Sequence, residues 1–65
     1  MDNDHLMTIE ELAAFLNLSK HTVYQWRYRD EGPTGFRLGG KGQVRYRKSE
    51  VLNWLEGQRD DRPAA

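Results

Sequence analysis

Two helix-start signals lie close together near the beginning of this chain, and they limit what it can fold into. The run Thr8-Ile9-Glu10-Glu11 has the form of a capping box, with Thr8 as the N-cap and Glu11 reaching back to it. Helical spacing of apolar residues follows at Ile9, Leu12, Ala13, Phe15 and Leu16. Asn17 tolerates the left-handed conformation that ends a helix, and Ser19 is a good N-cap for a second helix over residues 20–29. We therefore expect two short helices joined by a tight turn.

The second half of the chain alternates in polarity and then returns to helical spacing. Residues 31–35 contain Gly and Pro, which interrupt both helices and strands. Two short strands are expected next, each with one buried face, at Phe36, Leu38, Val44 and Tyr46. The helical period returns from about Lys48 with Val51, Leu52, Trp54 and Leu55, and Gly57 is expected to end that helix. The pattern predicts a mostly α fold in the order helix, helix, hairpin, helix, with one domain over 7–57 and tails at 1–6 and 58–65.

Length and composition exclude several classes of protein. A chain of 65 residues is one domain, and it buries only about 60% of its unfolded surface, too little interior for a deep catalytic cavity. It has no cysteine, which excludes disulfides, thiolate zinc sites and a Cys nucleophile. Asp2 and Asp4 stand where a signal peptide carries positive charge, and the longest apolar run, 12–16, is too short to span a membrane. We expect a soluble, cytoplasmic binding module.

Charge is distributed unevenly along the chain although the net charge is zero. Residues 1–19 carry four acids and no Lys or Arg, and residues 49–65 carry four acids against two cations. Residues 20–48 carry eight cations against two acids, a local charge of +6. A basic middle between acidic ends favours a nucleic-acid partner, because clustering of cations matters more than the total.

The second predicted helix presents two different faces. At about 100° per residue, Val23 and Trp26 fall on one side, which we expect to be buried. The opposite side carries a polar stripe made of His21, Tyr24, Gln25 and Tyr28. One rim of the stripe holds Lys20 and Arg27, and the other holds Thr22 and Arg29. Solvated faces favour Glu and Lys, so two tyrosines here point to a binding role.

A helix of this kind suits the major groove of double-stranded DNA. Base edges would face the stripe, and the phosphates beside the groove would face the rims. Gln25 can pair bidentately with adenine and His21 can donate to guanine, and a good bidentate pair discriminates bases by about 1–3 kcal/mol. Tyr24 and Tyr28 can instead donate to phosphate or pack against a neighbouring element. We predict that the stripe and both rims bind DNA.

The predicted hairpin has a glycine-rich tip, Gly39-Gly40-Lys41-Gly42-Gln43. A P-loop needs Ser or Thr after its Lys and then a helix, whereas here Gly42 and a strand follow. Glycines let the backbone approach DNA closely. Lys41 therefore suits a phosphate or minor-groove contact rather than a nucleotide site.

The chain resembles the excisionase and AlpA-like family of small winged helix-turn-helix proteins, which includes phage excisionases, those of mycobacteriophages among them. Residues 8–16 and 19–27 carry the resemblance in the two helices. Residues 36–39 and 44–55 are similar to the wing strands and the closing helix of that family. The likeness covers roughly residues 7–57. The chain departs from the family in its longer wing loop and at Arg27, where many relatives keep an apolar residue.

The resemblance implies a fold related to the DNA-binding domains of MerR-type regulators and an architectural role without catalysis. The second helix would enter the major groove, and the wing would reach the backbone or the minor groove. The wing residues expected to bind DNA are Arg37, Gly40, Lys41, Gly42, Arg45 and Arg47. Such proteins bind adjacent repeats of a phage attachment site cooperatively and head to tail, bend the DNA and direct the phage integrase toward excision in the bacterial host. Two alternatives stay open: a small AlpA-like transcriptional regulator and a protein-interaction adaptor for integrase.

Other site chemistry finds no support in the pattern. His5 and His21 lie on different predicted elements with no thiol nearby, which argues against a metal site. Ser19, His21 and Asp30 have the composition of a catalytic triad, but Ser19 is better used as an N-cap. We therefore expect no catalytic residue, metal, cofactor, small-molecule ligand or membrane partner.

Overall fold

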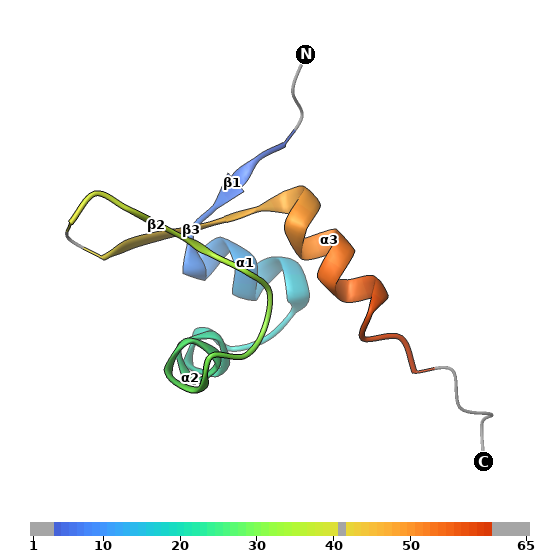
Figure 1. Cartoon of the computed structure of the whole chain (residues 1–65). Coiled ribbons are helices and arrows are strands. Elements are labelled where there is room, and N and C mark those ends of the chain that lie inside the picture. Colours follow the sequence, from blue (N-terminus) through green and yellow to red (C-terminus); the bar gives the residue numbers. More distant parts are fainter. Residues whose placement is uncertain (1–3, 41, 61–65) are drawn as a thin grey trace.

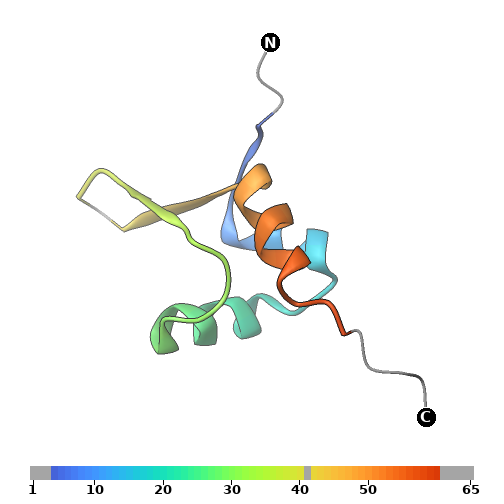
Figure 2. The same cartoon turned by 45° about the vertical axis from the view of Figure 1, so that its right-hand side comes forward.

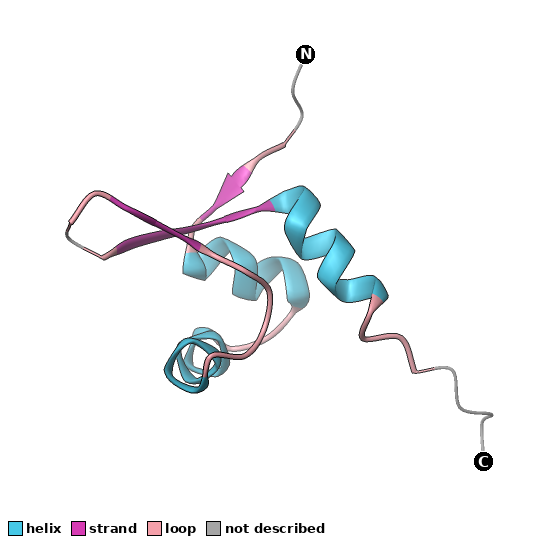
Figure 3. Cartoon of the chain, in the orientation of Figure 1, coloured by secondary structure: helices cyan, strands magenta, loops and turns pink. Residues whose placement is uncertain are grey.

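Three helices and a small antiparallel sheet make up the fold in the computed structural model, which describes residues 4–40 and 42–60 (Figures 1 and 3). The helices are α1 (Ile9–Leu16), α2 (Lys20–Arg29) and α3 (Lys48–Glu56). The strands are β1 (Leu6–Met7), β2 (Phe36–Leu38) and β3 (Gln43–Arg47). The predicted order of helix, helix, hairpin and helix is confirmed, with one additional strand ahead of α1.

The turn between α1 and α2 forms as the sequence predicted. Thr8 Oγ1 accepts the backbone N–H of Glu11 at 3.0 Å, and Glu11 Oε1 accepts the backbone N–H of Thr8 at 2.9 Å, which completes the capping box. Asn17 ends α1 in the left-handed conformation, with φ 59° and ψ 44°. Ser19 Oγ then accepts the backbone N–H of Thr22 at 3.3 Å and starts α2. Local hydrogen bonds therefore fix both ends of this turn.

The sheet has the strand order β1-β3-β2, so β3 is central. β1 pairs Leu6 with Arg47 and Met7 with Tyr46, both antiparallel. The sequence pattern did not predict this strand, because two residues carry no periodicity of their own. β1 exists through its pairing with β3, and its Met7 side chain enters the core.

One face of β2 was predicted to be buried, and this prediction is wrong. The register pairs Phe36 with Arg45 and Leu38 with Gln43, and cross-strand partners point to the same face of a sheet. That face lies opposite the buried side chains of Val44 and Tyr46, so Phe36 is half-buried and Leu38 is 41% exposed. Alternation along β2 showed that its two faces differ but could not show which face meets the core.

The core lies between the sheet and the three helices. Its buried residues are Met7, Leu12, Ala13, Val23, Val44, Tyr46 and Val51. Val23 is fully buried as predicted, whereas Trp26 is only half-buried and packs at the margin of this cluster. Trp54 is also half-buried, and Leu52 is 44% exposed although it continues the apolar stripe of α3. The two tryptophans are therefore marginal core residues rather than central ones.

The start of α3 is capped from a distant part of the chain. Arg47 is the N-cap residue, but its side chain makes no capping hydrogen bond. Asp4 supplies the acceptor instead: its carboxylate accepts the Ser49 backbone N–H at 2.8 Å and the Ser49 hydroxyl at 2.9 Å. The same carboxylate lies 3.2 Å from Arg47 Nε. A carboxylate at a helix N-terminus also complements the helix dipole, and α3 ends at Gly57 as predicted.

The wing, formed by β2, β3 and their connecting turn, projects on the same side of the molecule as α2, and α3 lies on the other side (Figures 1 and 2). This arrangement separates a surface made by α2 and the wing from a surface made by α3. No helix within residues 4–40 and 42–60 is both long enough and apolar enough to cross a bilayer.

Candidate nucleic-acid interface

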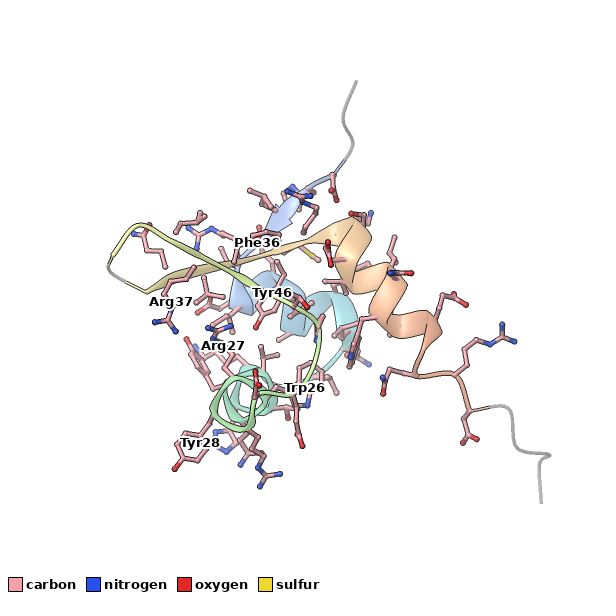
Figure 4. The ribbon with its side chains drawn as sticks, viewed as in Figure 1. Trp26, Arg27, Tyr28, Phe36, Arg37 and Tyr46 are labelled. Carbon is pink, nitrogen blue, oxygen red and sulfur yellow. The ribbon has the colours of Figure 1, made fainter. Side chains whose placement is uncertain are left out.

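The outward face of α2 presents most of the polar stripe predicted from the sequence. His21, Gln25 and Tyr28 are exposed, and Tyr28 is 92% exposed on the side of α2 that points away from the wing (Figure 4). Lys20 and Arg29 are also exposed, near the first and last turns. The structure therefore exposes three hydrogen-bonding side chains on one helix face, with a cation at each of its two rims.

Thr22 and Tyr24 differ from the rest of the predicted set in their surroundings. The Thr22 hydroxyl lies 3.2 Å from Ser19 Oγ and is part of the helix cap, and the residue is half-buried. Tyr24 is about half exposed and lies on the flank of α2 that faces the wing. The cap occupies Thr22, whereas Tyr24 is placed beside the hairpin.

Arg27 was expected on an open rim, but the structure places it between α2 and β3. Its Nη1 donates to Tyr46 Oη at 3.3 Å, and the side chain is half-buried. The role of Tyr46 here could not be predicted from the sequence, because Arg27 and Tyr46 lie on separate elements. The one signal in the sequence was Arg27 itself, because many members of the family that the chain resembles have an apolar residue at this position.

The three wing arginines do not share one face. Arg37 pairs with Val44 and points to the side of the wing that faces α2 (Figure 4). Arg45 and Arg47 alternate with Val44 and Tyr46 on β3 and therefore emerge on the opposite face. Arg47 is engaged there, because Asp4 pairs with it and its Cζ lies 5.0 Å from the centroid of the Phe36 ring. Arg37 alone of the three points toward α2.

A groove of about 560 Å³ runs between α2 and the wing. Its charged lining includes Arg27 and Arg37 and one acid, Glu10. Arg45 also borders the groove from β3, although its side chain emerges on the opposite face of the strand. Tyr24 and the backbone near Gly42 and Gln43 complete one end of the groove. Two cations, Arg27 and Arg37, against one acid make this concave surface attractive to an anion.

The wing tip is a tight turn with glycines in the left-handed region, Gly39 at φ 63° and Gly42 at φ 76°. A Cβ added at Gly39, Gly40 or Gly42 would meet no atom of the described residues within 4 Å, so each of these three positions has room for a side chain. Lys41, predicted to contact DNA from this tip, lies outside the described residues. No group of three or more His, Cys, Asp or Glu side chains that could hold a metal ion occurs in the described part of the chain.

Helix, turn, helix, hairpin and closing helix together define a winged helix-turn-helix protein, with α2 in the position of the recognition helix. The family model described as "Helix-turn-helix domain" matches residues 6–59, and the chain belongs to that family. No curated protein and no solved structure matches the chain. Family membership supports a DNA-binding function with double-stranded DNA as the partner, in a family that is typically non-enzymatic.

Proposed function

We propose that this chain is a sequence-specific architectural DNA-binding protein that acts as a phage excisionase. It binds adjacent repeats of an attachment site cooperatively and head to tail, bends the DNA, and directs the phage integrase toward excision. The observation that carries the proposal is the placement of the open polar face of α2 and the cationic groove beside it on one side of the molecule.

Recognition of bases is assigned to the outward face of α2. An α-helix with its side chains is about 10–12 Å across, and the major groove of B-DNA is about 12 Å wide, so α2 fits the groove along its length. His21, Gln25 and Tyr28 then meet base edges, because they are exposed on the outward face. Gln25 is the strongest candidate for sequence discrimination, because its amide can both donate to and accept from adenine.

Affinity that does not depend on sequence is assigned to the cations around that face. Lys20 and Arg29 lie near opposite ends of α2, and Arg37 comes from the wing. Phosphate contacts of this kind fix the register and orientation of a protein on the duplex. Glycines at the wing tip let the backbone approach the duplex closely.

Cooperative assembly is proposed from the polarity of charge. α3 carries Glu50 and Glu56 on a surface that also contains Leu52, whereas most of the described Lys and Arg residues lie on α2 and the wing. An acidic side and a basic side let protomers on neighbouring sites attract each other.

A gel-shift titration on phage attachment-site DNA tests the proposal, with circularly permuted probes that report bending. A ladder of cooperative complexes with increasing bend is expected for an excisionase. A single unbent complex at one promoter-like site would favour a transcriptional regulator instead. Binding to integrase without salt-dependent binding to DNA would favour an adaptor.

A further inference from the structure

The hydrogen bond between Arg27 and Tyr46 joins the recognition helix to the central strand of the sheet. Arg27 Nη1 donates to Tyr46 Oη at 3.3 Å. The Tyr46 ring is 2% exposed and belongs to the core, so its hydroxyl is a fixed point. No other hydrogen bond is recorded for the Arg27 guanidinium within residues 4–40 and 42–60, and this group carries five N–H donors.

The connection between α2 and β2 closes over this pair. A Cβ at Gly35 would lie 2.9 Å from Tyr46 Cε1 and 3.2 Å from Arg27 Nη1, closer than side chains normally approach. The backbone at Gly35 therefore packs directly against the Arg27–Tyr46 contact. On this side Arg27 also lines a hollow of about 330 Å³ with Tyr46 and the acids Asp30 and Glu31. It lines the groove between α2 and the wing as well, so the residue borders both concave surfaces.

The groove that Arg27 lines collects positive charge from both of its walls. Arg37 reaches it from β2, and the opposing acid is Glu10 at the start of α1. Two guanidinium groups converging on one concavity repel each other unless an anion lies between them. The groove flanks α2 rather than its outward face, so a backbone phosphate is better placed to reach it than a base edge.

We propose that Tyr46 is a positioning residue for DNA binding: its hydroxyl holds the Arg27 guanidinium in the groove, where Arg27 and Arg37 together bind one backbone phosphate. This inference rests on the proposed function as a DNA-binding protein and adds to it a residue that does not touch DNA. A planar guanidinium binds phosphate through two parallel N–H groups, so its orientation matters as well as its charge.

A double-mutant cycle on DNA affinity tests the proposal, with Tyr46→Phe, Arg27→Met and the double variant measured on target and random duplexes. Arg27→Met is expected to weaken binding to both the target and the random duplex. It should also reduce the magnitude of the salt slope by about 1, because about one phosphate contact is lost. Tyr46→Phe keeps the buried ring and is expected to lower the affinity for both duplexes by roughly fivefold, as expected for the loss of one hydrogen bond. The double variant should bind no more weakly than Arg27→Met alone.

Two matched controls lie on the α3 side of the molecule. Ser49→Ala removes a hydroxyl that also makes a hydrogen bond within the fold, to Asp4. Arg59→Met removes one positive charge, from a position near Glu56. Both controls should leave DNA affinity within about twofold of the wild type, and urea unfolding of every variant shows that only folded protein is compared.

Additive losses from Tyr46→Phe and Arg27→Met would overturn the proposal, and so would a Tyr46→Phe variant that loses stability but keeps full DNA affinity. Arg27→Lys tests the same contact without altering the buried ring: it keeps the charge but loses the planar fork, and it should bind several-fold more weakly. Arg27→Lys binding equal to that of the wild type would also contradict the proposal. If the wild-type chain bound DNA without salt dependence, the proposed function itself would fail. If the wild type bound DNA with the expected salt dependence but Tyr46→Phe and Arg27→Met showed no coupling, only the role of Tyr46 would fail.

Discussion

The indole rings of Trp26 and Trp54 meet across α2 and α3, with their centroids 5.3 Å apart and their planes tilted by 59°. Tilted aromatic pairs at this separation stabilise a fold by about 0.5–1.5 kcal/mol beyond the area they bury. The contact ties α2 to α3 at the margin of the core. The orientation of α2 therefore depends on a residue of α3 as well as on the turn that precedes α2.

Trp26→Ala is expected to lower the free energy of unfolding by about 3 kcal/mol, at the lower end of the cost for a tryptophan because the ring is partly exposed. Domains of this size have only about 3–5 kcal/mol to lose. Urea unfolding followed by far-UV circular dichroism, with equal sucrose for all variants, measures the loss. Leu52→Ala on α3 is the control and should cost under about 1 kcal/mol, since Leu52 is 44% exposed. Equal losses would contradict the packing described for Trp26.

Gly32→Ala is expected to destabilise the fold much more than Gly39→Ala. Both glycines have positive φ, 82° and 63°, so both substitutions carry a backbone cost of about 1–2 kcal/mol. A Cβ at Gly32 would also lie 2.6 Å from Cε3 of Trp26, whereas one at Gly39 meets nothing within 4 Å. Crowding of this kind adds about 1–3 kcal/mol. The difference between the melting temperatures of the two variants measures the cost of crowding at Gly32. Melting temperatures that agree within error would argue against this crowding.

DNA binding by the wild type should depend steeply on salt. If about five phosphates are contacted, log K falls against log salt with a slope near −4 to −5. Lys20→Ala and Arg29→Ala should weaken binding to all sequences and flatten this slope by about 1 each. Gln25→Ala should instead relax sequence preference at one position. Fluorescence anisotropy on target and random duplexes measures all three, and equal losses on random DNA would refute this division of roles.

Arg37→Ala and Arg47→Ala should behave differently although both residues were predicted from the sequence to bind DNA. Arg37 faces α2, so Arg37→Ala should reduce the magnitude of the salt slope by about 1. Arg47 pairs with Asp4 on the other face of the sheet, so its removal should lower stability by about 0–1 kcal/mol and change the slope less. Anisotropy titrations at several salt concentrations decide between them. Matching slope changes would mean that the wing meets DNA with its outer face.

Local signals in the sequence predicted the helical part of this fold. Thr8, Ser19 and Asn17 each act through hydrogen bonds or backbone preferences within a few residues. Their effects can therefore be predicted from the residues next to them in the sequence. The confirmed bounds of α2 follow from such signals. The exposed stripe of α2 was predictable for the same reason, since helical geometry alone places His21, Gln25 and Tyr28 together.

Contacts between distant residues could not be predicted in this way. Asp4 caps α3 through Ser49, 45 residues further along the chain, and no local pattern encodes that meeting. Arg27 and Tyr46 are 19 residues apart, and their hydrogen bond depends on how the sheet packs against α2. The choice of the inner face of β2 likewise depends on register with β3, which alternation leaves open.

The two-residue strand β1 has a consequence for the order in which this domain assembles and opens. α1, α2 and the hairpin are built from contacts between residues near each other in sequence, which form quickly. β1 can pair only after β3 is in place, because Leu6 lies opposite Arg47. The amides of β1 should therefore be the first in the sheet to exchange with solvent hydrogen. Opening at this edge would release the Asp4 cap of α3 while α1, the turn and α2 stay folded.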